Sequence, residues 1–158
     1  MDNLIYDRTQ ADVNRAIELN SKYNAGTITA EELEEWDDFL KGAIDYQTLN
    51  RVGEWVEYLS DKLNSYSYLQ TTSPKTDWVE TDFMSVEQSL TYLQNIRTLM
   101  NAINVRLTAE LPNSMNKLTF ESANAIEKIL YDLDTGISNM EQAWKYSGEV
   151  ISGEGYMS

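Results

Sequence analysis

Carboxylates are the only abundant groups in this chain that could act as catalytic acids, catalytic bases or metal ligands. The sequence has 26 Asp and Glu residues but no Cys and no His. Cys–His and Ser–His–Asp catalysis are therefore excluded, and so are zinc sites built on Cys or His. Disulfides are excluded too, so cysteine usage says nothing about the redox compartment.

A glycan hydrolase would need two of these carboxylates on either side of a cleft. Small helical lysozymes place a Glu, an Asp and a Thr at fixed spacings, and we looked for that pattern. Glu18 with Thr27 and Glu34 with Ala43 both fail it, because neither second position is an Asp. We therefore expect no activity of this kind.

Residues 132–136 read Asp-Leu-Asp-Thr-Gly, which resembles the start of a calcium-binding loop. Such a loop needs a further oxygen ligand at position five and a Glu at position twelve. Counting from Asp132, these positions are Gly136 and Ala143. Since Leu133 also belongs to an apolar helical stripe, a helix interior with exposed carboxylates is the better interpretation.

Two further motif types give no support for catalysis. Residues 114–117 match Ser-x-x-Lys, but the companion motifs of the penicillin-recognising enzymes are absent from the sequence. The glycine-rich patterns that hold phosphate groups are absent as well. We therefore predict a protein that is not an enzyme, with no catalytic residue, no cofactor and no bound metal.

Aromatic side chains with a polar tip are the remaining candidates for function, since they are favoured at protein interfaces and sugar platforms. The sequence has 10 Tyr and 4 Trp. Tyr66, Tyr68 and Trp78 lie at or near a predicted loop, and they are the candidate partner contacts. Trp78 has an alternative role as a plug at the end of a helical bundle. The other three tryptophans lie on predicted helices, where we expect them in or near the core: Trp36, Trp55 and Trp144.

Composition points to one folded, acidic domain. The chain has 158 residues, of which 42% are apolar and 11% aromatic, and its net charge is −14. Such a surface repels phosphate backbones and anionic lipids, so we expect no nucleic-acid partner. No apolar run approaches the roughly 18 residues that span a bilayer, and residues 1–13 lack the features of a secretory signal. We expect no membrane insertion.

Capping residues and apolar periodicity predict five helices. After an extended arm over residues 1–8, the predicted starts follow Thr9, Thr29, Asp45, Ser85 and Thr119. The third helix is expected over residues 46–69, the fourth over 86–107 and the fifth up to Gly148, with loops at 70–84 and 108–118.

Apolar stripes on the last three helices organise the fold. The final helix carries Ile126, Leu130, Leu133, Ile137, Met140 and Trp144 at spacings of three and four. A matching stripe on the third helix comprises Leu49, Val52, Val56, Leu59, Leu63 and Tyr66. The fourth helix has a wide apolar face that includes Val86, Leu90, Leu93, Ile96 and Leu99. A wide face indicates contact with two neighbours.

These patterns predict an all-α protein, an antiparallel bundle of three long helices with an N-terminal helical hairpin. Residues 1–44 would form the arm and hairpin packed on the bundle, residues 45–148 the bundle, and residues 149–158 a flexible tail. Gly53 lies inside a stripe-bearing helix, where glycine costs about 1 kcal/mol relative to Ala. We expect it to permit the close approach of another helix.

Long blocks of the sequence resemble a family of phage proteins. They read IYDRTQADVNRAIELN, GTITAEELEEW, KGAIDYQTLNRVGEWVEYLSDKLNSY, KTDW, YLQNIRTL, LTFESANAIEKILYDLD and AWKYSGEVISGE. In this order they are similar to a segment of virion structural proteins of phages and prophages of Firmicutes, described as minor structural or as tail- and baseplate-associated. The resemblance covers nearly the whole chain, and it transfers no catalytic or ligand residue.

The resemblance implies a structural role in the virion, through contacts with other virion or tail proteins, for a chain made in the cytoplasm of the bacterial host. Heptad-like stripes also permit a homo-oligomer. The main alternative is a module that binds host-surface carbohydrate or mediates adhesion, using Trp78 and neighbouring aromatics. A small glycan hydrolase is the third alternative, and the failed carboxylate spacing argues against it.

Overall fold

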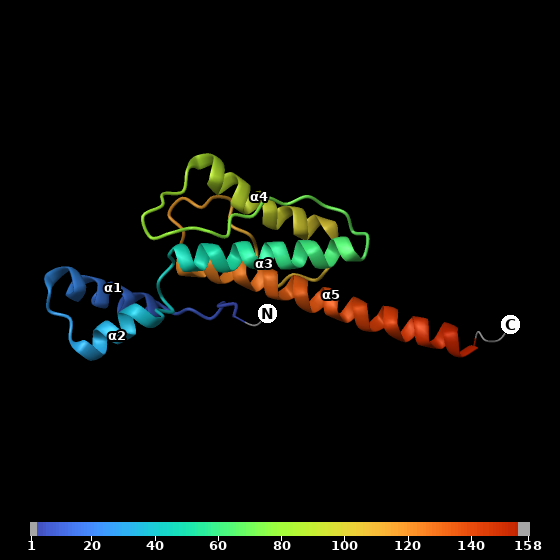
Figure 1. Ribbon diagram of the computed structural model, residues 1–158, viewed down its shortest axis with the longest axis horizontal. Helices are drawn as coiled ribbons and strands as arrows, with labels where there is room; N and C mark the ends of the chain where they lie inside the picture. The colour runs from blue at the N-terminus through green and yellow to red at the C-terminus, as the bar shows by residue number, and fades with distance from the viewer. Residues whose placement is uncertain (1–2, 155–158) are drawn as a thin grey trace.

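The computed structural model describes the backbone of residues 3–154 and the side chains of residues 3–147. This part of the chain is all-helical and contains no strand, so the predicted all-α class is confirmed (Figure 1). The helices are α1 (Gln10–Ala25), α2 (Ala30–Asp38), α3 (Tyr46–Ser65), α4 (Val86–Ala102) and α5 (Phe120–Glu154).

The predicted helix starts are confirmed. At each start a side chain accepts a hydrogen bond from a backbone N–H of the first turn, which satisfies one of the donors that a helix leaves unpaired. The capping residues are Thr9, Thr29, Asp45, Ser85 and Thr119. In α1, α2 and α4 the third helical residue returns a bond to the cap and completes a capping box.

The helix ends were predicted less well. α3 ends at Ser65 and α4 at Ala102, several residues before the predicted ends at 69 and 107. The prediction that Gly148 ends the last helix is wrong, because α5 continues to Glu154. Of the tail predicted over residues 149–158, residues 149–154 are therefore helical, and residues 155–158 lie outside the described part.

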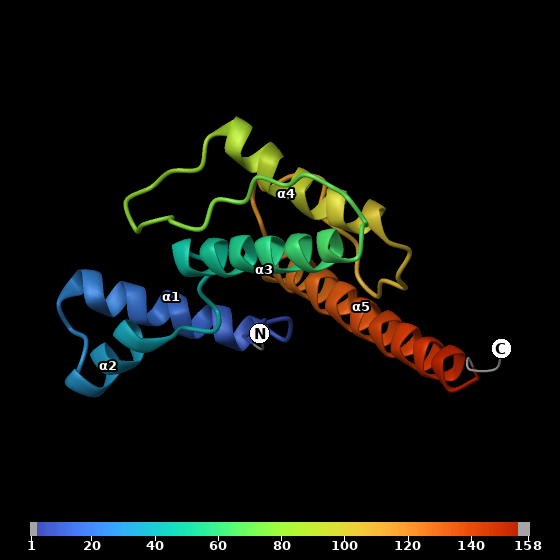
Figure 2. The same ribbon diagram turned by 45° about the vertical axis from the view of Figure 1, so that its right-hand side comes forward.

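The three helices of the bundle, α3, α4 and α5, run in the same direction, so the predicted antiparallel arrangement is wrong (Figures 1 and 2). Arg51 of α3 bonds Glu127 of α5, and Lys62 bonds Ser138, with a separation of 76 residues in both pairs. A constant separation means that the two helices advance together. In an antiparallel pair, residue numbers would rise on one helix as they fall on the other.

The connections explain the parallel arrangement. Between α3 and α4 the chain returns along α3: Gln70 bonds Ser60, and Trp78 bonds Asn50. Between α4 and α5 it returns along α5, where Thr108 bonds Asp132. At about 3.3 Å per extended residue the first connection, about 20 residues long, can span twice the roughly 30 Å of α3.

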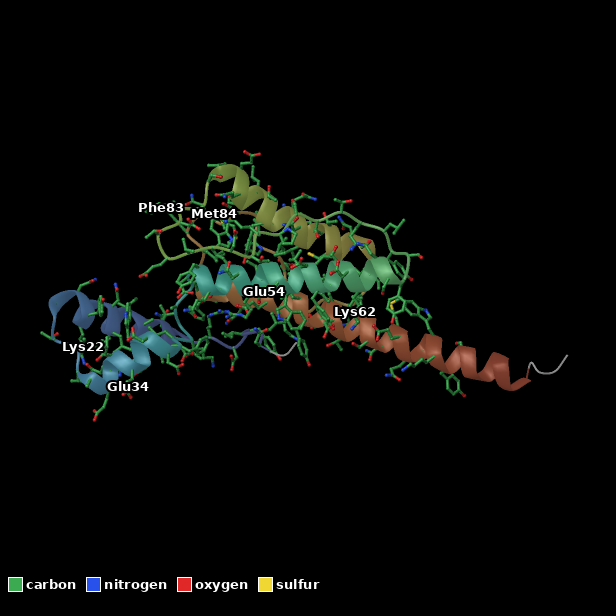
Figure 3. The ribbon with its side chains drawn as sticks, viewed as in Figure 1. Lys22, Glu34, Glu54, Lys62, Phe83 and Met84 are labelled. Carbon is green, nitrogen blue, oxygen red and sulfur yellow. The ribbon has the colours of Figure 1, made fainter. Side chains whose placement is uncertain are left out.

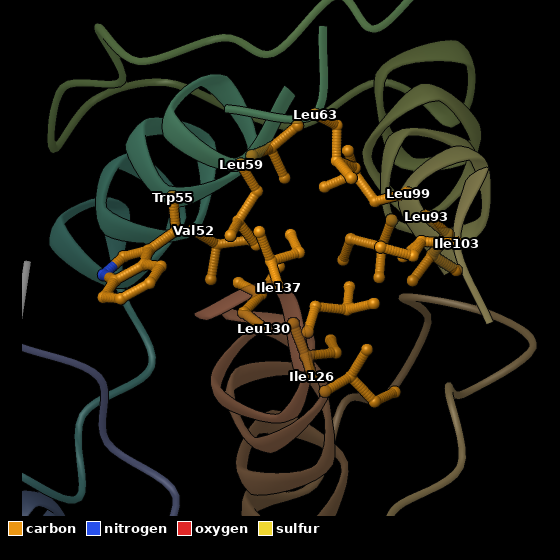
Figure 4. Close-up of a cluster of buried hydrophobic side chains, with 14 residues drawn as sticks. Val52, Trp55, Leu59, Leu63, Leu93, Leu99, Ile103, Ile126, Leu130 and Ile137 are labelled. Atoms are coloured by element: carbon orange, nitrogen blue, oxygen red, sulfur yellow. The ribbon is translucent and has the colours of Figure 1, made fainter. Parts of the chain in front are cut away.

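The core lies where α3, α4 and α5 meet (Figure 4). Most of its side chains come from the predicted stripes, and Trp55 and Ile129 are additional members. The core side chains are Val52, Trp55, Val56, Leu59, Leu63, Leu93, Ile96, Leu99, Ile103, Ile126, Ile129, Leu130, Leu133 and Ile137. The central positions of the stripes are therefore buried as predicted, whereas Val86, Leu90 and Trp144 are exposed and the direction of the helices was not predicted.

The N-terminal segment consists of an arm and a helical hairpin. Helices α1 and α2 pack mainly on each other, with Tyr23 stacked on Trp36 at 5.4 Å between ring centroids and Arg15 paired with Glu35. The hairpin extends from the end of the bundle at which α3 begins (Figures 1 and 2). It is anchored through the arm, which lies against α3 and α5.

A buried ionic cluster anchors this arm. Glu127 of α5 is 0% exposed, and its two oxygens accept four hydrogen bonds from the arm and from α3. The donors are the Ile5 backbone, the Arg8 guanidinium and, at two points, the Arg51 guanidinium. Four bonds match the acceptor capacity of a carboxylate, so this charge is fully satisfied away from water.

Candidate partner-binding surfaces

A groove lies between the hairpin and the adjacent end of the bundle. We call it the end groove. Its volume is about 760 Å³, and α1, the α2–α3 connection and the two connections of the bundle form its walls. A half-buried apolar floor comes from Val13, Ala16, Trp36, Leu40, Ile44, Leu49, Met84, Met115 and Leu118. A volume in this range is typical of binding clefts.

Local packing sets the shape of the groove. Gly42, in the α2–α3 connection, lies directly against the α1 backbone at Asp12 and Val13, where a Cβ would overlap. This contact folds the connection back on α1 and fixes one wall. On the opposite wall, the Asn50 amide accepts a hydrogen bond from Trp78 N–H at 2.7 Å and donates to its carbonyl at 2.9 Å.

The rim of the end groove is acidic. Four exposed carboxylates line it, those of Asp38, Asp45, Glu80 and Asp82, and no Lys or Arg is among its described lining residues. Asp45 caps α3, and Asp82 accepts a bond from the Val79 backbone. No ion pair to any of the four occurs within the described part of the chain.

An exposed apolar surface continues from the groove wall onto α4. Phe83 is 95% exposed, Val86 78% and Leu90 60%, and we call these three residues the α4 patch. Figure 3 shows Phe83 and Met84 on the connection before α4, at the end of the bundle that faces the hairpin. Val86 and Leu90 were predicted on the buried face of this helix, and the structure corrects that expectation because both side chains are largely exposed.

A second surface lies at the opposite end of α3. Tyr66 contacts Trp144 of α5 with 4.8 Å between ring centroids, and Tyr68 stacks on the same indole at 6.1 Å. We call these residues the aromatic cluster. Trp144 is 38% exposed, so the prediction of a core position for it is corrected. Trp55, by contrast, is buried as predicted, and Trp36 is half-buried.

The candidate contacts predicted from sequence have different environments. Tyr66 is exposed and Tyr68 half-buried, and both belong to the aromatic cluster. Trp78 is only 4% exposed, so it offers almost no surface to a partner, and the expectation of a contact there is corrected. Its indole packs at the groove end of the bundle, with the Lys75 ammonium 4.9 Å from the ring centroid.

The acidic residues examined for chemistry have structural contacts. Asp132 and Asp134 both lie inside α5, as the helix-interior interpretation requires. Asp132 is buried rather than exposed, and it accepts bonds from Thr108 and Lys128. Asp134 pairs with Lys62 of α3. Among the described residues, no group of His, Cys, Asp and Glu is arranged to hold a metal ion.

The buried polar residues were missed at the sequence level. Arg8, Arg51 and Glu127 carry charge, and charged residues are almost never fully buried unless they are paired. One signal was present: Glu127 lies four residues after Ala123 and three before Leu130, on the buried face of α5. A charge on an apolar face indicates a buried partner, but the sequence does not identify the partner.

Comparison with known proteins gives no match to a family model, to a curated protein or to a solved structure. Across residues 3–154, no helix combines the length and hydropathy needed to cross a bilayer. The physical evidence on function therefore consists of the two exposed surfaces and the charge distribution around them.

Proposed function

We propose that this chain is a structural protein that acts by binding other proteins, as a tail or baseplate component of a phage or prophage of Firmicutes. The observation that carries the proposal concerns apolar positions of the helical stripes. Several positions that the stripes assign to a core face are exposed in the folded chain, including Val86, Leu90 and Trp144. Such positions mark surfaces that a partner covers.

The exposed positions gather at the two ends of the bundle. Val86 and Leu90 belong to the α4 patch near the end groove, and Trp144 belongs to the aromatic cluster at the far end of α3. A 20-residue helix separates the two ends by roughly 30 Å. This distribution supports a linking role, in which each end contacts a different subunit of an assembly.

The proposal makes the protein non-enzymatic and places it in the virion after synthesis in the host cytoplasm. The placement rests on the resemblance to virion structural proteins. The non-enzymatic role is supported by the contacts of Asp132, Asp134 and Glu127, each of which is bound by cations or hydroxyl groups in a structural role.

Cross-linking within assembled particles tests this function. The tagged chain would be expressed in a bacterial host that produces phage particles containing a protein of this kind. The purified particles would then be cross-linked and analysed by mass spectrometry. We expect the chain to copurify with tail or baseplate proteins and to form cross-links at both ends of the bundle. Its absence from washed particles would overturn the placement in the virion.

Two double variants of α4 test whether the apolar α4 patch itself contacts the partner. Val86→Ser with Leu90→Ser removes apolar surface from α4, whereas Glu87→Ser with Gln94→Ser changes exposed polar residues of the same helix. We expect the first pair to reduce incorporation into particles several-fold and the second pair to leave it unchanged. Equal incorporation of both pairs would remove the α4 patch from the interface.

Carbohydrate binding remains the second candidate, because stacked and partly exposed aromatic rings form sugar platforms. With Trp78 buried, its platform would be Trp144 with Tyr66 and Tyr68. A glycan array probed with the native chain and with Trp144→Ala tests it. Binding that disappears in the variant would support this function, and an array without signals would exclude it.

A further inference from the structure

We propose that the end groove is the docking site for a basic amphipathic segment of a partner protein. The inference rests on the proposed protein-binding function and names the chemistry of one partner. It follows from three properties of the groove that occur together: an apolar floor, a rim of carboxylates that form no ion pair within the described residues, and the absence of lysine and arginine among its described lining residues.

The floor selects apolar side chains. Trp36, Leu40 and Met84 are half-buried there, so each presents part of its surface to the groove. Methionine and aromatic side chains adapt to varied apolar partners. Ile17 is 59% exposed on the α1 wall, where an incoming leucine or isoleucine would cover it. Burying such surface away from water stabilises the complex.

The rim selects positive charge. Asp38 is the last residue of α2, and Glu80 lies in the connection on the opposite wall. Neither side chain makes a hydrogen bond or an ion pair within the described part of the chain. Lys41, next to the groove, is engaged by Asp7 at 2.9 Å. The negatively charged rim can therefore form ion pairs with cationic side chains of a partner.

The charge of the whole chain disfavours competing occupants. Two copies of a chain with net charge −14 repel each other, and nucleic acids and anionic lipids are repelled for the same reason. A basic amphipathic helix matches both features, because its apolar face meets the floor while its lysines reach the rim. Helix-in-groove docking is an established mode of protein recognition.

A binding assay with a defined probe tests the inference. The probe is a fluorescein-labelled peptide of about 18 residues, built only from leucine and lysine with leucines on one helical face. Its counterpart has glutamate in place of every lysine. Fluorescence anisotropy at physiological salt with the full chain should show saturable binding of the lysine peptide and none of the glutamate peptide.

Charge-reversal variants locate the binding. Asp38→Lys with Glu80→Lys alters the rim, and Glu54→Lys with Glu57→Lys makes the same change in net charge on the exposed face of α3 (Figure 3 labels Glu54). We expect the rim pair to weaken binding about tenfold or more and the α3 pair to weaken it less than about twofold. Equal effects would mean general attraction and would overturn the inference.

An apolar variant provides an independent measurement. Ile17→Ser replaces an exposed apolar residue of the α1 wall, and Leu69→Ser replaces an exposed leucine at the other end of the bundle. We expect Ile17→Ser to weaken binding of the lysine peptide about threefold or more, and Leu69→Ser to leave it unchanged. Unchanged binding for Ile17→Ser overturns the inference. Cross-links to virion proteins without any binding of the lysine peptide would overturn it while leaving the proposed function intact.

Discussion

Arg51 of α3 and Glu127 of α5 form a buried two-point ion pair, with Nε 3.0 Å from Oε2 and Nη2 2.8 Å from Oε1. Arg8 of the N-terminal arm donates to the same Oε1 at 2.8 Å. One carboxylate therefore joins three segments that are far apart in the chain. The pair also fixes the relative position of α3 and α5, so it contributes to both packing and direction.

Loss of the Glu127 charge should destabilise the fold strongly. Glu127→Gln keeps the shape of the side chain but leaves the Arg8 and Arg51 guanidinium groups buried without a counter-charge. Removing one partner of a buried ion pair costs about 3–5 kcal/mol. Urea denaturation should show a decrease of this size in the free energy of unfolding.

The control for this prediction is Glu121→Gln, an exposed carboxylate in the first turn of the same helix. We expect a change below about 0.5 kcal/mol there. A loss below about 1 kcal/mol for Glu127→Gln would show that the buried cluster is not the anchor of the arm.

The parallel direction of α3 and α5 can be tested by cross-linking. The sequence has no native cysteine, so the introduced thiols are the only ones that react. Tyr66→Cys with Trp144→Cys places thiols at positions whose rings are 4.8 Å apart between centroids, and a short bismaleimide should link them efficiently. Tyr66→Cys with Phe120→Cys joins the end of α3 to the start of α5, and it should not react. Cross-linking of the second pair would contradict the parallel arrangement.

The elements of the fold were predictable from sequence, but their direction was not. Capping residues such as Thr29 and Ser85 act within a few residues, so they can be recognised locally. The direction of α4 depends on the path of residues 66–85, which lie extended along α3 and make contacts at long range. Their length was the only signal, since antiparallel bundles usually need connections of only 2–8 residues.

Replacement of Gly53 should destabilise the protein. We expected another helix to approach this glycine, but the structure places the backbone of Lys75 there instead, so close that a Cβ would overlap its carbonyl. Ala would gain about 1 kcal/mol in helix propensity, but the cost of displacing the connection around Lys75 should be larger. Gly53→Ala should lower the melting temperature by several degrees, and Glu54→Ala beside it should leave the melting temperature nearly unchanged. A raised melting temperature for Gly53→Ala would refute the close approach.

The candidate surfaces were predictable only in part. A sequence pattern shows that one face of a helix is apolar, but it does not show whether another part of the chain covers that face. Tyr66 and Tyr68 were identified by their place beside a loop. Trp78 lies in a loop too, yet its backbone is bonded to Asn50 and its side chain is buried. Val86 and Leu90 have the spacing of core residues, and only the folded arrangement shows that they stay exposed among the described helices.

The connection between α4 and α5 should weaken in acid. Burial favours the neutral form of Asp132, but bonds from Lys128 and Thr108 outweigh it and hold its pKa below the usual value. A lowered folded-state pKa contributes stability that is present above the unfolded pKa of about 3.9 and lost as pH falls through the folded value. The stabilisation should therefore be complete at pH 7 and should disappear progressively below about pH 4.

Asp132→Asn isolates this contribution. At pH 7 the variant should lose about 1–3 kcal/mol of unfolding free energy, because the charged acceptor for Thr108 and Lys128 is gone. At about pH 2.5 the difference from the native chain should shrink, since the native carboxyl is then being protonated. Asp61→Asn, at an exposed carboxylate on α3, should show little difference at either pH. If the loss caused by Asp132→Asn is the same at both pH values, it arises from packing and not from the charge of Asp132.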